Sequence, residues 1–110
     1  MSLQHKSLAA GRWSELPFLE QMAHVGGEVE RALNWRAKKN TSYCLQAAER
    51  ALELMDLLLD AVKDGPRLKE LARAREVLVD HFFGTNQYLF TAESLRKYFL
   101  CFSYAARRNS

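Results

Sequence analysis

The feature that most constrains the fold is a run of apolar residues that recurs every three or four positions. Its members are Leu45, Ala48, Leu52, Met55, Leu59 and Val62. This spacing places them on one face of an α-helix, as in the packed seam between helices. A second set widens the apolar arc: Cys44, Ala47, Ala51, Leu54 and Leu58. A helix with so wide an apolar arc lies at the centre of a bundle or is shared with another chain.

The same spacing predicts a helix before this seam. It begins near Ser14, and its apolar period continues through Gly26-Gly27, so we interpret the two glycines as a point of close helix approach. The basic run at 36–39 suits its end, because cations favour the negative end of the helix dipole. Asn40-Thr41-Ser42 then supplies N-cap candidates for the seam helix.

Two more helices follow the seam. Asp64-Gly65-Pro66 is a sharp boundary, since glycine suits a helix end and proline is tolerated in a first turn. The third helix runs to about Phe83 and stops at Gly84, and Thr91 caps the fourth. The packed face of the fourth helix is expected to contain Leu95, Tyr98 or Phe99, Phe102 and Ala106.

Short connections between these helices make neighbours antiparallel. At 110 residues the chain is long enough to bury one core and too short for two domains. We therefore predict an all-α fold, an antiparallel up-down four-helix bundle. It forms a single domain over residues 13–110, preceded by a flexible N-terminal tail over residues 1–12.

Composition restricts the class of protein only loosely. A formal charge of +3 permits an acidic partner without requiring one. The N-terminal residues lack the apolar core of a signal peptide, and no apolar run approaches the ~20 residues of a membrane span. Cys44 and Cys101 lie far apart inside helical patterns. We expect two reduced, mostly buried thiols and a cytoplasmic protein.

No standard catalytic motif is present: the sequence has no P-loop, no dinucleotide-binding glycine motif, no nucleophile elbow and no HExxH. His5, His24 and His81 have no ligand spacing among themselves. We therefore expect no cofactor and no metal, and we favour a protein that is not an enzyme.

The most organised polar feature is a stripe on the first helix, formed by His24, Glu28, Arg31 and Trp35. These residues follow one another at helical spacing beside the apolar face. One interpretation is a recognition surface for an anionic or planar ligand. The other, which we favour, is an ion-paired stripe where this helix meets its neighbour.

Arg75 is a second unusual residue, because the count 68, 71, 75, 78, 82 places an arginine among leucines and a phenylalanine. A buried charge there requires a carboxylate, for which Glu28, Glu49 and Glu53 are the candidates. We expect a structural clamp. It would belong to a polar cluster that joins the first three helices through Glu28, Arg31, Glu53 and Arg75.

Arg75, Glu76 and His81 also resemble a pattern of the HEPN domains, which are small helical nucleases. In that family an arginine and a histidine line an RNA-cleaving site at a dimer interface. Six residues of straight helix set two side chains about 120° apart. Because of this angle, Arg75 and His81 could meet at one site only if the helix ends between them or a second subunit supplies one of them.

A longer set of residues is similar to a family of short bacterial proteins of unknown function, over roughly residues 13–107. The strings that carry it are Gly27-Glu28-Val29-x-Arg31-Ala32-x-x-Trp35-Arg36 with Asn40, Glu49-Arg50-Ala51-Leu52-Glu53-Leu54, Arg67-Leu68-Lys69-Glu70-Leu71 and Arg75-Glu76-Val77-Leu78-Val79-Asp80. The resemblance brings no activity. It implies that the first-helix stripe and the charges on the next two helices belong to one shared architecture.

These observations predict a helical-bundle interaction module that acts by self-association or by binding another macromolecule. A homo-oligomer is expected, with a dimer favoured; a protein partner is preferred to RNA, and no membrane partner is expected. The candidate binding residues are His24, Glu28, Arg31, Trp35, Glu53 and Arg75. The alternative is a HEPN-like ribonuclease or a toxin–antitoxin component that uses Arg75 and His81.

Overall fold

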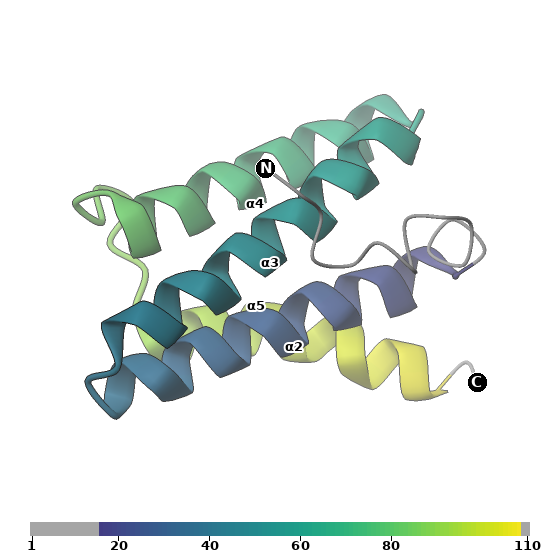
Figure 1. Ribbon diagram of the computed structural model, residues 1–110. Coiled ribbons are helices and arrows are strands. Elements are labelled where there is room, and N and C mark those ends of the chain that lie inside the picture. Colours follow the sequence, from purple (N-terminus) through teal and green to yellow (C-terminus); the bar gives the residue numbers. More distant parts are fainter. Residues whose placement is uncertain (1–15, 109–110) are drawn as a thin grey trace.

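Four helices make up the computed structural model, which describes residues 16–108 (Figure 1). They are α2 (Phe18–Ala37), α3 (Thr41–Ala61), α4 (Gly65–Phe83) and α5 (Ala92–Arg108). No strand occurs between residues 16 and 108. The predicted all-α, four-helix fold is confirmed, while the N-terminal tail predicted over residues 1–12 lies outside the described residues.

Local chemistry explains most of the helix ends. The side chain of Asn40 accepts a hydrogen bond from the Tyr43 N–H at 3.0 Å, which caps α3 as predicted. Thr91 Oγ1 accepts from the Ser94 N–H at 3.0 Å and caps α5. Gly84 is the C-cap of α4. The predicted start of the first helix near Ser14 lies outside the described residues, and α2 begins at Phe18 after Pro17.

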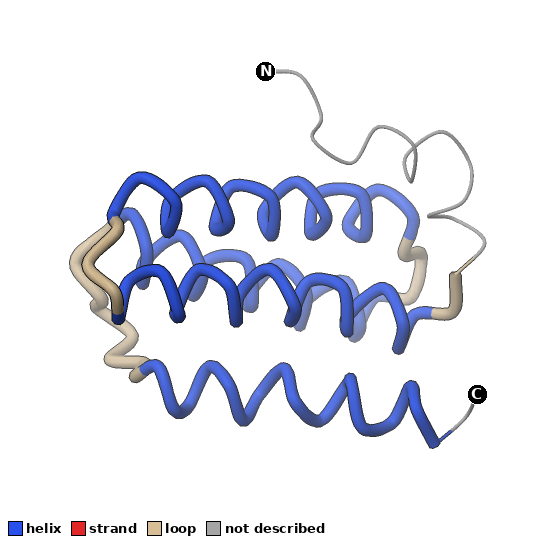
Figure 2. Tube along the Cα trace, turned by 60° about the horizontal axis from the view of Figure 1, so that its bottom comes forward, coloured by secondary structure: helices blue, strands red, loops and turns tan. Residues whose placement is uncertain are grey.

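The helices pack in the order α5, α2, α3, α4. α2 is in close contact with both α3 and α5, α3 is in close contact with α4, and α4 and α5 approach each other at few points. Figure 2 shows the three connections, over residues 38–40, 62–64 and 84–91. The bundle is therefore well packed along three of its sides and open along the fourth.

Contacts between α2 and α3 show their relative direction. The rings of Trp35 and Tyr43 lie 4.9 Å apart, close to the connection between the two helices. Farther from that connection, Arg50 Nε lies 2.8 Å from Glu28 Oε2. Seven residues back along α2 thus correspond to seven residues forward along α3, so these two helices are antiparallel.

The wide apolar arc of α3 is covered within the chain, by α2 on one side and α4 on the other. Its most buried side chains belong to the set that widens the arc, together with two residues of the predicted seam: Cys44, Ala47, Ala48, Ala51, Leu54, Met55 and Leu58. Leu45, Leu52, Leu59 and Val62 are only partly buried. The core face of α3 is therefore rotated from the predicted seam toward the second set.

The two glycines of α2 differ in their surroundings. A Cβ built on Gly26 would lie 2.9 Å from the Cβ of Phe99 on α5, whereas a Cβ on Gly27 would meet nothing within 4 Å. α2 continues through both residues without a break. The predicted close approach is confirmed at Gly26, which lets α5 lie against α2.

This difference makes a matched pair of variants informative. We expect Gly27→Ala to raise the free energy of unfolding by about 0.5–1 kcal/mol, because alanine loses less backbone entropy in a helix. Gly26→Ala has the same favourable backbone-entropy effect. Its new methyl group also forces α2 and α5 apart, which should cost about 1–3 kcal/mol of unfolding free energy. Chemical denaturation of the two variants measures both, and equal stabilisation by both would contradict the close approach.

The two cysteines are free, and only one of them is buried. Cys44 packs in the core, but Cys101 is exposed, so the prediction of two mostly buried thiols is wrong for Cys101. The core face of α5 is formed by Leu95, Phe99 and Ala106. Cys101 follows Phe99 by two residues and therefore points about 200° away from it.

No helix within residues 16–108 has the length and apolar character needed to cross a membrane. The cytoplasmic location stays a prediction.

Candidate functional site

Glu28 is the centre of a polar contact between α2 and α3. Its carboxylate is buried, with 5% of the residue exposed, and forms ion pairs with Arg31 on its own helix and with Arg50 on α3. A buried carboxylate costs free energy unless charged donors satisfy it, and two guanidinium groups do so here. The favoured interpretation of the stripe, an ion-paired contact between neighbouring helices, agrees with this geometry at Glu28 and Arg31.

The two ends of the stripe, His24 and Trp35, lie on either side of this contact along α2. Trp35 is partly buried and packs edge-on against Tyr43, with the Lys38 ammonium 5.2 Å from the centre of its ring. His24 is exposed on α2, near the opposite end of the stripe. The structure thus brings Glu28 and Arg31 together with Arg50, while Trp35 packs against Tyr43.

Arg75 pairs with Asp56 on α3, and not with Glu28, Glu49 or Glu53. Its Nε lies 2.6 Å from Asp56 Oδ1, and both side chains are partly exposed to solvent. The count that placed Arg75 on an apolar face is therefore wrong. The buried residues of α4 are Leu71, Ala74, Val77, Leu78, His81 and Phe82. This face puts Arg75 at the edge of the helix, within reach of the polar side of α3.

The predicted cluster of Glu28, Arg31, Glu53 and Arg75 is therefore divided. Glu28 and Arg31 join Arg50 at the α2–α3 contact, and Arg75 joins Asp56 at the α3–α4 contact. Glu53 is buried on α3, with 4% of the residue exposed. Neither Arg50 nor Asp56 was among the candidate binding residues predicted from the sequence.

The two ion-pair sets should differ in their contribution to stability. Glu28→Gln keeps the size of the side chain but removes a buried charge that accepts from two arginines, so we expect a loss of about 1.5–3 kcal/mol. Arg75→Ala breaks a partly exposed pair and should cost at most about 1 kcal/mol. Urea denaturation gives both values. A larger loss for Arg75→Ala than for Glu28→Gln would show that the clamp is at Arg75 after all.

His81 is buried at the end of α4, beneath the guanidinium of Arg36. Arg36 Nη1 lies 2.9 Å from His81 Nε2, and Nη2 donates to the His81 carbonyl at 3.3 Å. Because a guanidinium only donates, the imidazole Nε2 is the acceptor and the ring is neutral. Burial, followed by the charge of Arg36, lowers the pKa of His81.

His81 and Arg75 have different surroundings in the described part of the chain. Arg36 comes from α2 and covers His81, whereas Asp56 comes from α3 and holds Arg75. The structure does not bring the two HEPN-like residues together within one chain. The ribonuclease alternative would thus have to use a buried, neutral histidine and an arginine that already has a carboxylate partner.

The lowered pKa of His81 predicts acid sensitivity. The unfolded chain binds a proton more readily than the folded one, so the stability is full above pH ~6.5 and falls as the pH drops toward the folded-state pKa. In His81→Gln, whose side-chain oxygen can still accept from Arg36, this part of the loss should disappear. Unfolding free energies measured between pH 7.5 and pH 5 would refute the idea if parent and variant fell in parallel.

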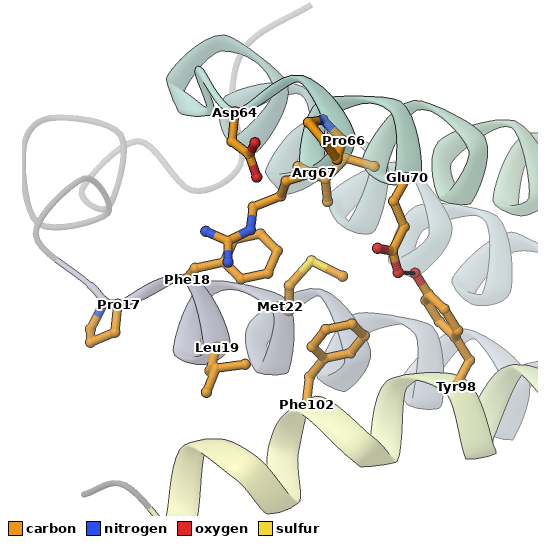
Figure 3. Close-up of a pocket in the computed structure, with 11 residues that line it drawn as sticks. Pro17, Phe18, Leu19, Met22, Asp64, Pro66, Arg67, Glu70, Tyr98 and Phe102 are labelled. Carbon is orange, nitrogen blue, oxygen red and sulfur yellow. Dashed lines mark hydrogen bonds between the residues drawn. The ribbon is translucent and has the colours of Figure 1, made fainter.

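A trough follows the open side of the bundle, between α4 and α5. It consists of two adjoining pockets of about 560 and 210 Å³. Figure 3 shows the larger pocket, where Arg67 lies over Phe18 and the side chains of Met22 and Phe102 point inward. The smaller pocket is lined mainly by Ala74, Val77, Phe90, Leu95 and Phe99. We call the two together the α4–α5 trough.

Glu70 and Tyr98 line both pockets and join the two helices across the trough. The Tyr98 hydroxyl donates to Glu70 Oε1 at 3.4 Å. Burial, the negative charge of Glu70 and this hydrogen bond raise the pKa of Tyr98 to about 12. Tyr98 therefore remains a neutral donor at physiological pH. The Tyr98 hydroxyl is therefore suited to donating a hydrogen bond across the trough.

Charges of alternating sign follow the α4 edge of the trough at every third residue. They are Asp64, Arg67, Glu70 and Arg73. Within the described residues, no ion pair engages any of these four side chains. Arg67 instead rests on the ring of Phe18, 4.2 Å from its centre. The trough thus combines an apolar floor with an edge of charges that have no ionic partner in this part of the chain.

The trough was not predicted from the sequence. Phe102 and Tyr98 were expected on the packed face of the fourth helix, and Arg67 and Arg73 were not singled out as a site. The available signal was the composition of α4, whose first half consists mainly of charged residues, leucine and alanine. Such a helix covers one neighbour and leaves little apolar surface for a second.

Comparison of the chain with protein-family models, with curated proteins and with solved structures finds no match. Within residues 16–108, no group of three His, Cys, Asp or Glu side chains is arranged to hold a metal ion.

Proposed function

We propose that this protein is an interaction module that binds an amphipathic helix of a partner protein in the α4–α5 trough. The observation that carries the proposal is the opening between α4 and α5, where core residues such as Met22 and Leu71 line a surface pocket. Its larger pocket has a volume within the range of about 300–1,000 Å³ found for ligand sites.

The shape of the trough favours a helix as the occupant. Its α4 side runs from Pro66 to Val77, a length of about 16 Å or three helical turns. An amphipathic helix of that length presents apolar side chains at steps of three and four, and these would enter the two pockets in turn. Glu70 and Tyr98 separate the two pockets and so space the inserted side chains.

The charges on the α4 edge favour a partner with charges of both signs. Positive groups at Arg67 and Arg73 alternate with negative groups at Asp64 and Glu70, and a complementary helix would carry the opposite signs at the same three-residue interval. A register shift of three residues would bring like charges together, which opposes binding. The edge therefore selects the register as well as the partner.

A photo-cross-linking experiment tests this proposal. Phe102 lines the trough, and Tyr104 lies two residues farther along on the exposed side of α5. With benzoylphenylalanine at position 102, we expect an adduct to a partner peptide that has a helical apolar pattern and charges of both signs. The same probe at position 104 is the control and should not capture that peptide.

A synthetic peptide of the captured sequence then allows a matched comparison on α4. Arg73→Glu reverses a charge of the edge, and Lys69→Glu makes the same change outside the trough. We expect Arg73→Glu to weaken binding about tenfold or more, which is about 1.4 kcal/mol, and Lys69→Glu to leave affinity within about twofold. Equal effects of the two variants, or no adduct specific to position 102, would refute the proposal.

A further inference from the structure

α5 presents a third face that neither the core nor the trough uses. Leu95 and Phe99 face the core, and Tyr98 and Phe102 face the trough. On the opposite side, Leu100 and Tyr104 are each 59% exposed. Tyr104 lies about 180° around the helix from Leu95. Tyr104 is thus directed away from the bundle, and Leu100 lies beside it at the rim of a hollow that Gly26 and Gly27 of α2 also line.

Charges flank this apolar pair at both ends of the helix. Glu93 and Lys97 precede it as an exposed i,i+4 ion pair, with side chains 79% and 75% exposed, and Arg108 follows it, 5.8 Å from the centre of the Tyr104 ring. Together with Cys101, these residues form one stripe along the outside of α5: Glu93, Lys97, Leu100, Cys101, Tyr104 and Arg108. We call it the outer stripe.

The outer stripe is complementary to itself in the antiparallel orientation. If two copies meet on a twofold axis between positions 100 and 101, position 93 of one copy faces position 108 of the other. Glu93 then faces Arg108, about 11 Å from the axis. Lys97 faces the ring of Tyr104, in a cation–π arrangement. In a parallel pair each residue would face its own copy, so Glu93 would meet Glu93 and Lys97 would meet Lys97.

From this complementarity we infer that the protein forms a homodimer through an antiparallel contact between the outer stripes of two α5 helices. The contact is isologous, as expected of a twofold dimer. One helix pair forms a small interface, so the dimer should dissociate on dilution. This inference does not rest on the proposed function, because the outer stripe and the trough occupy different sides of α5.

Cys101 offers a direct readout of the predicted contact. It is exposed near the proposed axis, whereas Cys44 is buried and protected from reagents. A short bis-maleimide added to the purified full chain should give a covalent dimer through Cys101. Cys101→Ser should abolish that product. A parent chain that remains monomeric in sedimentation at 100 µM and gives no covalent dimer would overturn the inference.

A matched pair of leucines tests the apolar part of the contact. Leu100→Glu should raise the dimer dissociation constant at least tenfold. Leu89→Glu makes the same change at a residue that is 81% exposed in the 84–91 connection, and it should have no effect. Circular dichroism confirms that each variant is folded. A dimer unaffected by Leu100→Glu would place the interface elsewhere and overturn the inference.

Charge exchange tests the orientation. Glu93→Arg alone brings two arginines together, and Arg108→Glu alone brings two glutamates together, so each variant should dimerise less than the parent. An equimolar mixture of the two should recover dimers, because both contacts of the heterodimer then pair opposite charges. Failure of the mixture to recover would overturn the antiparallel arrangement. Trough binding is read by the adduct at position 102, so the two proposals fail separately.

Discussion

The rest of the structure depends on the packing of α2 against two helices at once. Gly26 has no side chain, so Phe99 of α5 can pack directly against the backbone of α2 at this position. On another side of α2, Glu28 reaches α3 and is satisfied by Arg50. With α2 occupied on both sides, α4 is left with α3 as its one close neighbour. The opening between α4 and α5 is a consequence of this arrangement.

Ionic contacts connect the helices at their polar edges. Arg96 of α5 lies 3.0 Å from Glu30 of α2, and Arg75 of α4 pairs with Asp56 of α3. Exposed pairs of this kind contribute little free energy each, so apolar burial carries most of the stability. Their role is geometric: each pair is satisfied at one relative position of its two helices. Arg36 fixes the C-terminal ends of α2 and α4 in the same way, through its contacts with the ring and the carbonyl of His81.

Helix positions and caps could be predicted because they depend on neighbouring residues alone. Asn40, Thr91 and Gly84 act where the sequence places them, since a cap needs only its own turn. Rotation about the helix axis could not be predicted, because it depends on which neighbour is closest. The buried face of α4 keeps Leu71, Leu78 and Phe82 but has Ala74 in place of Arg75, which lies about 100° farther around the helix. That rotation divides the predicted polar cluster and exposes the trough.

α5 has few buried residues, yet its three sides allow it to pack in the bundle and also to contact other molecules. One side holds the helix against α2 through Leu95 and Phe99, and a second lines the trough through Tyr98 and Phe102. The outer stripe lies on the third side, so a dimer formed there would leave both troughs open. Two linked troughs would engage a partner with two binding helices far more tightly than one, because the second contact forms at high effective concentration. Self-association through one side of α5 would then strengthen recognition through another without any new contact to the partner.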